Sequence, residues 1–296
     1  MRSQQKEILY TQGMHVVLLR ALFILLAFLF TGYSVLAQEK LGNKECNVIF
    51  TESNHSFGEG EELTYLANYK WGLVSTDVGE ATLRVSRIIN ANIPYYFIEI
   101  MAKTYKFYDR IFKVRDTYTS RFSVDTFKPE YFHRNIFEGG YSKRNTLIFD
   151  WEKNQLKSTT QRKKNPATDS IMSLPECTFD ILSLLYYSRN LDFTFVKQGD
   201  VFPMTFALDD DIYNLKYRYI GKETVSLDGL GNFRCLKFAL EVVAGDVFKG
   251  DEEILLWVTD DRNHLPIKAE SPIIVGKVRI TLMKMNNIRH PLTSMN

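Results

Sequence analysis

Apolar and polar residues alternate with a period of two along most of this chain from residue 61 onward. In the stretch "EATLRV", residues 80–85, every second residue is apolar, and the same holds for "YNLKYRY", residues 213–219, and "KVRITL", residues 277–282. Because successive side chains of a strand point to opposite faces, this pattern predicts strands with one buried and one solvated face. Such strands are typical of antiparallel sheets, so the pattern constrains the chain to a β-rich fold.

Turn-forming residues separate these stretches at intervals of roughly ten residues. Pairs such as Gly139-Gly140 and Asp228-Gly229 favour tight turns, because glycine and aspartate tolerate left-handed backbone conformations. The spacing predicts roughly a dozen strands in sequence.

One stretch departs from the period of two. The segment "CTFDILSLLYYSRNLDF", residues 177–193, follows Pro175 and gathers its apolar residues on one wide face, as in a helix packed against a sheet. We expect Thr178 to cap this helix, with Asp180 in its first turn. The predicted fold is therefore all-β: a large curved antiparallel sheet, or an open β-barrel, with one mid-chain helix at residues 178–192.

The N-terminal segment has the features of a secretory signal peptide. Arg20 precedes the apolar run "ALFILLAFLF", residues 21–30, and "VLA", residues 35–37, supplies small or aliphatic residues before a cleavage point after Ala37. The run is shorter than the roughly 20 apolar residues that a membrane-spanning helix needs. We therefore predict a signal peptide at 1–37, an N-terminal extension at 38–56 and a single β-rich domain at 57–290.

Removal of residues 1–37 leaves a neutral chain. It takes away three of the 37 Lys and Arg residues and one of the 35 Asp and Glu residues, so that 34 of each remain. A neutral chain lacks the basic surface that nucleic-acid binding requires, so we expect no nucleic-acid partner.

The three cysteines of an exported chain would meet an oxidising compartment. Cys235 falls within the strand-like stretch "NFRCLKFALEV" and is expected to be a buried small hydrophobic residue. Cys46 and Cys177 lie at the edges of predicted elements among polar residues, so we favour a disulfide between them, although spacing alone does not fix the pairing.

The stretch "LLWVTDDRNHLPIKAE", residues 255–270, concentrates the residues most suggestive of a reaction centre. Strand-like alternation on both sides favours a turn, because aspartate and asparagine hydrogen-bond to the local backbone. As a metal site it is weak, since the adjacent residues Asp260 and Asp261 point to opposite faces of an extended chain. The four histidines after residue 37 show none of the known zinc-site spacings, and no nucleotide-binding loop is present. We therefore assign no catalytic residue, no metal and no cofactor.

The stretch "FYDRIFKVRDTY", residues 107–118, is the better candidate for a binding site. An arginine framed by aromatic rings suits an anionic or sugar-like ligand, and the alternative is a ladder of Asp–Arg pairs on a solvated sheet face. The aromatic content of 14% is compatible with either a lipid-binding cavity or a large β core. Our candidate ligand-binding residues are Tyr108, Asp109, Arg115, Asp116, Trp71 and Trp257.

Three stretches carry a resemblance to a known family. They are "FGEGEELTYLANYKWGLVSTDVGEATLRV" at 57–85, "FDILSLLYYSRN" at 179–190 and "LWVTDDRNHLPIKAESPIIVGKVRITL" at 256–282. Together they resemble the exported bacterial family of domain of unknown function 3108. The resemblance implies an antiparallel β architecture in the periplasm or cell envelope of a Gram-negative bacterium, and it supplies no catalytic residues. The last hairpin is also similar, at the level of the fold only, to the half-barrels of periplasmic lipoprotein carriers.

Three functional hypotheses follow. The leading one is a non-enzymatic envelope protein whose curved sheet binds an apolar or amphipathic ligand, such as a lipid or glycolipid. The second is an assembly or scaffolding protein that binds another envelope protein, and either role is compatible with peripheral contact with the membrane. The third is a hydrolase acting on glycan or lipid, with two carboxylates brought by the fold to a separation of about 5–10 Å.

Overall fold

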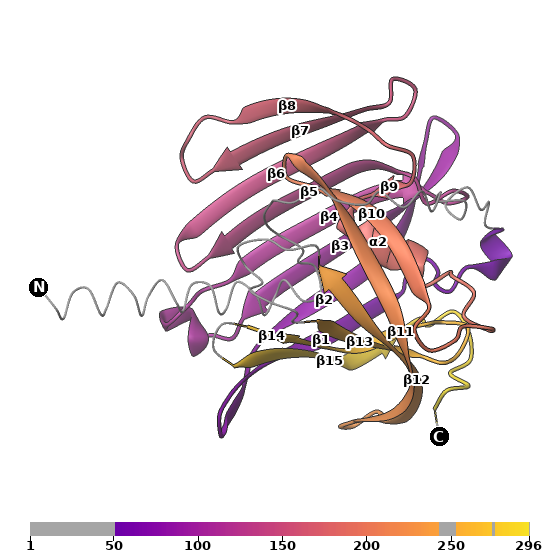
Figure 1. Ribbon diagram of the computed structural model, residues 1–296. Helices are drawn as coiled ribbons and strands as arrows, with labels where there is room; N and C mark the ends of the chain where they lie inside the picture. The colour runs from indigo at the N-terminus through magenta and orange to yellow at the C-terminus, as the bar shows by residue number, and fades with distance from the viewer. Residues whose placement is uncertain (1–50, 243–252, 274–275, 296) are drawn as a thin grey trace, which may run out of the picture.

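A single 15-stranded sheet dominates the computed structural model, which describes residues 51–242, 253–273 and 276–295. The strand order is β8-β7-β6-β5-β4-β3-β2-β1-β15-β14-β13-β12-β11-β10-β9 (Figure 1). The first eight strands are β1 (Glu62–Trp71), β2 (Val74–Asn90), β3 (Ile93–Thr104), β4 (Arg115–Ser123), β5 (Pro129–Glu138), β6 (Tyr141–Asp150), β7 (Gln155–Arg162) and β8 (Thr168–Ser173). The remaining strands are β9 (Thr178–Phe179), β10 (Val201–Leu208), β11 (Asp211–Leu227), β12 (Gly231–Val242), β13 (Ile254–Thr259), β14 (Pro266–Pro272) and β15 (Lys277–Asn286).

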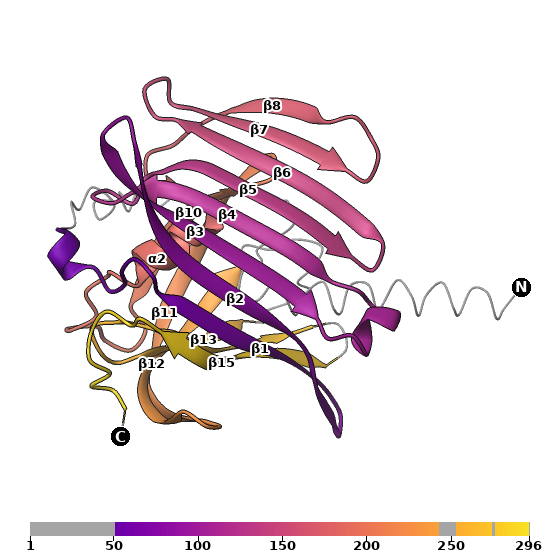
Figure 2. The same ribbon diagram turned by 180° about the vertical axis from the view of Figure 1, so that it is seen from behind.

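The sheet consists of two arms joined at the strands nearest the chain ends. Strands β1–β8, the N-terminal arm, pair antiparallel with their neighbours in sequence, and so do β10–β15 of the C-terminal arm, to which β9 adds a short parallel pair. β1 and β15 pair antiparallel and join the arms into one sheet. The sheet bends so that the arms face each other, with the helix α2 (Ile181–Ser188) between them (Figures 1 and 2). The predicted curved, mostly antiparallel sheet is confirmed.

The period of two places one side of each strand in a shared interior. Along β4 the half-buried and buried positions alternate without exception, and Phe122 is among the buried ones. Phe132 of the N-terminal arm and Phe206 of the C-terminal arm belong to the same apolar cluster as Leu182 and Tyr186 of α2. The core therefore lies between the two arms, and the helix fills its centre.

The helix begins later than the sequence suggested. Thr178, the expected cap, instead lies in β9 and pairs with Thr205 of β10. Asp180 caps the helix, because its carboxylate accepts the backbone N–H groups of Leu182 and Ser183 at 2.8 and 3.1 Å. The Ser183 hydroxyl accepts the Asp180 N–H in return, which completes a reciprocal capping box. The strand pair with β10 thus took Thr178 out of the helix, and the helix ends at Ser188 rather than 192.

The segment between β13 and β14 is a turn, as expected. Thr259 N–H donates to the Leu265 carbonyl at 2.9 Å, and one Asp261 oxygen accepts from the Thr259 hydroxyl and the Asn263 N–H. His264 has a φ of 41°, the left-handed conformation that such turns use. These polar residues therefore hold the turn itself.

The predicted signal peptide at 1–37 and Cys46 lie outside the described residues. In the described part of the 38–56 extension, a 3-10 turn, η1 (Glu52–Asn54), precedes His55 and Ser56, which are buried against the core. Cys235 is a free, buried cysteine, as predicted. Within the described ranges, the helices are all too short or too polar to cross a membrane.

Candidate functional site

An apolar pocket lies between the C-terminal end of α2 and the inner face of the C-terminal arm. Its volume is about 30 Å³ and it is partly open at one side. Its lining is Leu185, Ser188, Arg189, Leu191, Phe193, Phe202, Tyr217, Phe238, Leu256, Val258, His264 and Pro266. Apolar side chains form most of this wall, and the polar groups are confined to the side where the helix ends.

The strand register brings the aromatic part of the wall together. Phe202 of β10 pairs directly with Tyr217 of β11, and Phe238 of β12 pairs with Leu256 of β13. Directly opposed residues of adjacent strands share a face, so these side chains all point to the interior. Phe193, in the loop after α2, packs its ring 5.5 Å from that of Phe202 and 5.0 Å from that of Phe238. Alternation along the strands and one loop residue thus suffice to build the wall.

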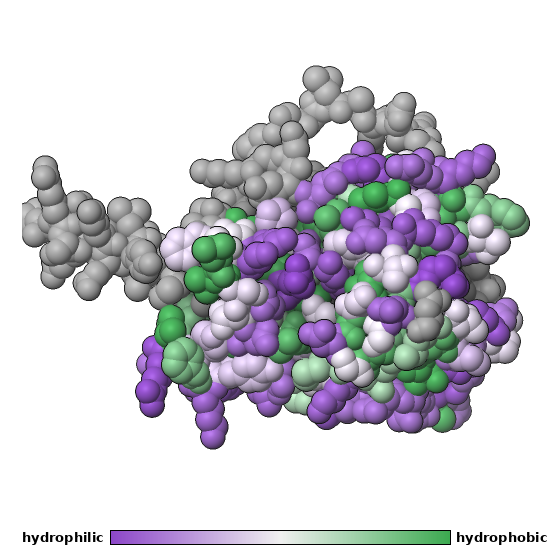
Figure 3. Space-filling view, turned by 90° about the horizontal axis from the view of Figure 1, so that it is seen from below, coloured by the Kyte–Doolittle hydropathy of each residue, from purple (hydrophilic) through white to green (hydrophobic). Residues whose placement is uncertain are grey.

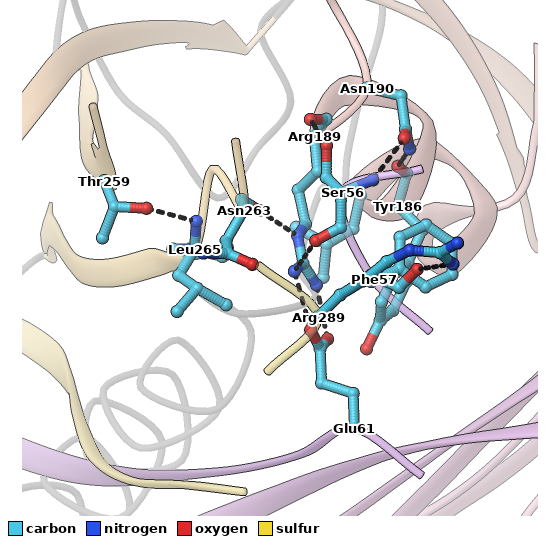
Figure 4. A network of polar contacts seen from close by, with 12 residues as sticks. Ser56, Phe57, Glu61, Tyr186, Arg189, Asn190, Thr259, Asn263, Leu265 and Arg289 are labelled. Atoms are coloured by element: carbon cyan, nitrogen blue, oxygen red, sulfur yellow. Dashed lines mark hydrogen bonds and ion pairs between the residues drawn. The ribbon is translucent and has the colours of Figure 1, made fainter. Parts of the chain in front are cut away.

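Arg189, which directly follows α2, forms the polar end of the pocket through a buried ion pair. Its Nη1 and Nη2 donate to the two carboxylate oxygens of Glu61 at 2.6 and 2.8 Å (Figure 4). Nε donates to the Asn263 carbonyl at 3.2 Å, and Nη2 also donates to the Ser56 carbonyl at 3.3 Å. Burial acts to lower the pKa of Arg189, but the Glu61 carboxylate outweighs it and the pKa is raised.

This ion pair fixes three parts of the chain relative to each other. Glu61 precedes β1, Asn263 lies in the β13–β14 turn, and Arg189 follows the helix. The guanidinium also lies over the rings of Phe57 and Tyr186, 5.4 and 5.2 Å from their centroids. Because its Nε and both terminal nitrogens have partners, Arg189 serves the fold rather than offering an unoccupied cation to a ligand.

His264 places a hydrogen-bond acceptor at the pocket. Its Nδ1 lies 2.7 Å from the Arg189 carbonyl, which can only accept, so Nδ1 carries the proton. Burial lowers the pKa of His264, so the ring is neutral near pH 7 and Nε2 is left as an acceptor. The ring packs 5.1 Å from Phe193 in an edge-on arrangement. The pocket therefore combines an apolar wall with one neutral imidazole.

Two of the predicted ligand-binding residues do come together, but at the opposite end of the sheet. Arg115 donates from Nη1 and Nη2 to the two oxygens of Asp109 at 3.0 and 2.6 Å. The Arg115 side chain is 40% exposed, which matches the expected alternative of an Asp–Arg pair on a solvated face. Tyr108, next to this pair in the 3-10 turn η2 (Tyr108–Arg110), hydrogen-bonds to the Thr76 hydroxyl.

The other three predicted residues lie apart from one another, although Trp71 is at the same end of the sheet as the Asp109–Arg115 pair. Asp116 follows Arg115 on β4, so its side chain points to the interior, where it is buried. Trp71 is exposed at the end of β1, whereas Trp257 is buried with the ammonium groups of Lys237 and Lys268 4.8 and 4.1 Å from its ring centroid. The six residues therefore do not form one site.

Sequence reasoning missed a buried cluster of charged side chains between the arms. Arg134 of β5 and Lys143 of β6 both contact the carboxylate of Asp209, which precedes β11. Beside them lie the buried carboxyl groups of Asp116 and Glu138, and one Asp116 oxygen accepts the Phe137 N–H at 2.9 Å. Burial raises the pKa of Asp116 to about 7, and burial together with the Asp116 charge raises that of Glu138 well above its usual range.

A signal for this cluster was present in the sequence. In "YFHRNIFE", residues 131–138, the charged residues Arg134 and Glu138 occupy the same alternating positions as the apolar residues Phe132 and Ile136. Charges at inward positions of a predicted strand require buried partners. Both carboxyl groups are buried in the interior, whereas glycosidase carboxylates stand about 5–10 Å apart across a cleft.

No metal site is evident in the part of the chain that the structure describes. There, histidine, cysteine, aspartate and glutamate side chains nowhere gather in groups of three or more that could hold an ion.

Comparison with known proteins identifies a family and a fold. A family model described as a protein of unknown function (DUF3108) matches residues 64–283. The crystal structure of a β-barrel-like protein of domain of unknown function DUF1849 from Brucella abortus matches with a TM-score of 0.52 and 11% sequence identity. That match covers 77% of this chain and 98% of the other, and at such identity it shows the fold alone. No curated protein matches this chain.

Proposed function

This chain belongs to the DUF3108 family of proteins of unknown function, and we propose that it binds an apolar or amphipathic ligand without catalysing a reaction. The pocket between α2 and the C-terminal arm supports this proposal, because apolar side chains form nearly all of its lining. Ligand sites of proteins are commonly concave and mostly apolar, with a few polar groups that orient the ligand. Here His264 is such a group.

The size of the pocket narrows the ligand class. A volume of about 30 Å³ is room for a small apolar group such as the end of a hydrocarbon chain, and not for a whole lipid. Because the pocket is partly open, the rest of the ligand would extend outward from it. A lipid or glycolipid with an acyl chain inserted end first fits both conditions.

We further propose that this binding takes place in the bacterial envelope. Support comes from the sequence, where the apolar run at 21–30 and the small residues before position 38 are typical of an exported protein. An envelope location would bring the pocket close to acyl-chain ligands.

Displacement of a fluorescent probe tests the proposal. Anilinonaphthalene sulfonate bound to the protein would be titrated with dodecanoate, in wild type and in two tryptophan variants. Leu256→Trp fills the pocket, and we expect it to weaken dodecanoate binding at least about ten-fold. Leu255→Trp is the matched control, because Leu255 is also half-buried but lies on the opposite face of β13.

Native mass spectrometry of protein purified from its own envelope provides the second measurement. We expect a retained mass in the range of a lipid, which Leu256→Trp reduces. Failure of dodecanoate to displace the probe, combined with a ligand-free spectrum, would contradict the proposal.

A further inference from the structure

Two exposed apolar tips lie at the end of the sheet that is farthest from the pocket. The first is the β1–β2 hairpin, where Trp71, Leu73 and Val74 are 54%, 105% and 54% exposed. The second is the β3–β4 connection, where Phe107 and Ile111 are 71% and 51% exposed. We name these five side chains the apolar tips.

The turn of the hairpin does not require an apolar residue. Trp71 pairs with Val74, so only two residues, Gly72 and Leu73, form the turn. Gly72 has a φ of 55°, a conformation that favours glycine, but Leu73 carries no such requirement. Two-residue turns usually carry polar residues. A leucine that is fully exposed in such a turn contributes none of the free energy that a buried leucine contributes to folding. The fold therefore does not explain Leu73.

The two tips are held side by side. The Tyr105 N–H donates to the Val78 carbonyl at 3.0 Å, and the Thr76 hydroxyl is hydrogen-bonded to that of Tyr108. Both views of the sheet show the β1–β2 hairpin and η2 projecting from the same end (Figures 1 and 2). In the space-filling view from below, apolar surface lies at this end next to strongly hydrophilic side chains (Figure 3). One flat surface could therefore meet both tips together.

The charges next to the tips are mostly positive. Lys70 precedes the hairpin turn, and Lys106, Arg110 and Lys113 alternate with the apolar residues of the β3–β4 connection; all four are exposed. Among the acidic residues nearby, Asp109 is neutralised by its ion pair with Arg115, and Glu80 by its ion pair with Lys103. The exposed Asp77 of the hairpin adds one negative charge. The tips therefore combine protruding apolar side chains with an excess of three positive charges.

We propose that the apolar tips and their basic residues dock the protein onto the surface of an anionic lipid bilayer. This docking goes beyond ligand binding in the pocket, which lies at the other end of the sheet. Apolar and aromatic side chains enter the region between headgroups and acyl chains, and tryptophan favours that depth. Basic residues near an anionic leaflet add electrostatic attraction to this insertion.

The shape of the surface favours a bilayer over a protein partner. A stable protein interface buries roughly 800 Å² of continuous surface on each partner. Five side chains on two narrow projections do not make such a surface, but a fluid bilayer closes around each projection separately. The adjacent lysines and arginine would also repel a second copy of the same end.

Vesicle flotation with single substitutions tests this inference. The chain as processed by the cell would be mixed with vesicles of phosphatidylcholine containing about one third phosphatidylglycerol, so that wild type and variants share the same N-terminus. We expect Leu73→Glu and Phe107→Glu each to lower the bound fraction at least about ten-fold. The matched control is Ile89→Glu, because Ile89 is 74% exposed at the opposite end of β2.

Two further measurements test whether the apolar tips and their basic residues are responsible for vesicle binding. Binding should weaken as the salt concentration rises from 50 to 500 mM, since exposed charges are screened over a few ångströms at high salt. The fluorescence of Trp71 should shift to the blue on vesicles, and Trp71→Phe should abolish that shift. Of the other two tryptophans, Trp257 is buried, and Trp151 is half-buried with its indole N–H donating to the Pro129 carbonyl.

Three results would overturn the inference: no binding to the anionic vesicles, binding that Leu73→Glu leaves unchanged, or binding that Ile89→Glu weakens equally. A wild-type dimer that Leu73→Glu dissociates, without vesicle binding, would replace the bilayer by a second copy of this chain. None of these outcomes depends on the pocket, because Leu256→Trp should float with the vesicles as wild type does.

Discussion

Arg134 and Asp209 form a buried ion pair that connects the two arms of the sheet, with Arg134 Nη2 as the donor. Lys143 Nζ lies 2.5 Å from the other oxygen of the same carboxylate. Burial alone would raise the pKa of Asp209, but the two cations outweigh it and the pKa is lowered. Asp209 therefore holds two strands of the N-terminal arm against the turn before β11, where the arms share no backbone pairing.

Substitution of Asp209 should destabilise the fold far more than substitution of its neighbour. Asp209→Asn leaves Arg134 and Lys143 buried without their carboxylate, and we expect a loss of about 3–5 kcal/mol in the free energy of unfolding. Asparagine tolerates the φ of 55° at this position, so backbone strain does not contribute. Asp210→Asn is the control, because the Asp210 side chain is 38% exposed, and it should cost less than about 1 kcal/mol. Urea denaturation measures both, and equal losses would contradict the assigned role.

The Asp116–Glu138 pair should make stability depend on pH. Both carboxyls have pKa values raised in the folded state, to about 7 for Asp116. At a pH between the unfolded and the folded pKa values, the folded chain therefore binds more protons than the unfolded chain. Their contribution is therefore fully present below the unfolded pKa of about 4 and is lost as the pH rises through 7. Within that window, the free energy of unfolding falls by about 1.4 kcal/mol per pH unit for each proton that the folded chain binds in excess of the unfolded chain.

Glu138→Gln tests this dependence, because the amide keeps the shape of the side chain and cannot ionise. We expect the variant to gain stability relative to wild type at pH 8 and to show a flatter profile between pH 5 and 8. Glu176→Gln, at an exposed turn position, should follow the wild-type profile. Parallel wild-type and Glu138→Gln profiles would show that the pair does not titrate in this range.

Two adjacent glutamates should differ sharply in their importance. Glu61→Gln leaves the buried Arg189 guanidinium without a counter-charge, and we expect a loss of about 3–5 kcal/mol in the free energy of unfolding. Glu62 pairs with Arg84 at 2.6 Å on the surface, so Glu62→Gln should change it by less than about 1 kcal/mol. Thermal or urea unfolding of the two variants makes the comparison, and a large loss in both would refute it.

The cysteines should divide into one bridged pair and one protected thiol. Cys46 lies outside the described residues, so the Cys46–Cys177 disulfide stays a prediction. Burial raises the pKa of Cys235 to about 12, and its thiol should react with iodoacetamide only after unfolding. Peptide mapping without reductant should find the Cys46–Cys177 link, and a linked Cys235 peptide would contradict this assignment.

Alternation was sufficient to predict the architecture but not the site. Period-two stretches such as residues 80–85 give strands, and these strands form the antiparallel pairs that the pattern favours. Thr178 failed as a cap because its pairing with β10 is a tertiary contact, invisible in local sequence. The turn around His264 was recognised from its aspartates and asparagine, which act locally.

The pocket itself could not be predicted, because its wall comes from six separate elements, α2 and β10 to β14, and from two of the loops that join them. Phe193 and Phe238 are 45 positions apart in the sequence, and only the bend of the sheet brings their rings within 5.0 Å. In the expected grouping around residues 107–118, Asp109 and Arg115 do come together, but Asp116 does not join them. Arg115 and Asp116 are neighbours in sequence, and alternation sends them to opposite faces of β4.

The pairing of β1 with β15 has a consequence for biosynthesis. A ribosome releases the N-terminal arm first, and each of its strands can pair at once with the strand just made. The edge strand of that arm, β1, lacks its second neighbour until β15 has been synthesised. During that interval the unpaired backbone N–H and C=O groups of β1 can pair with a strand of another molecule. A chain truncated before β15 should therefore aggregate and need a chaperone.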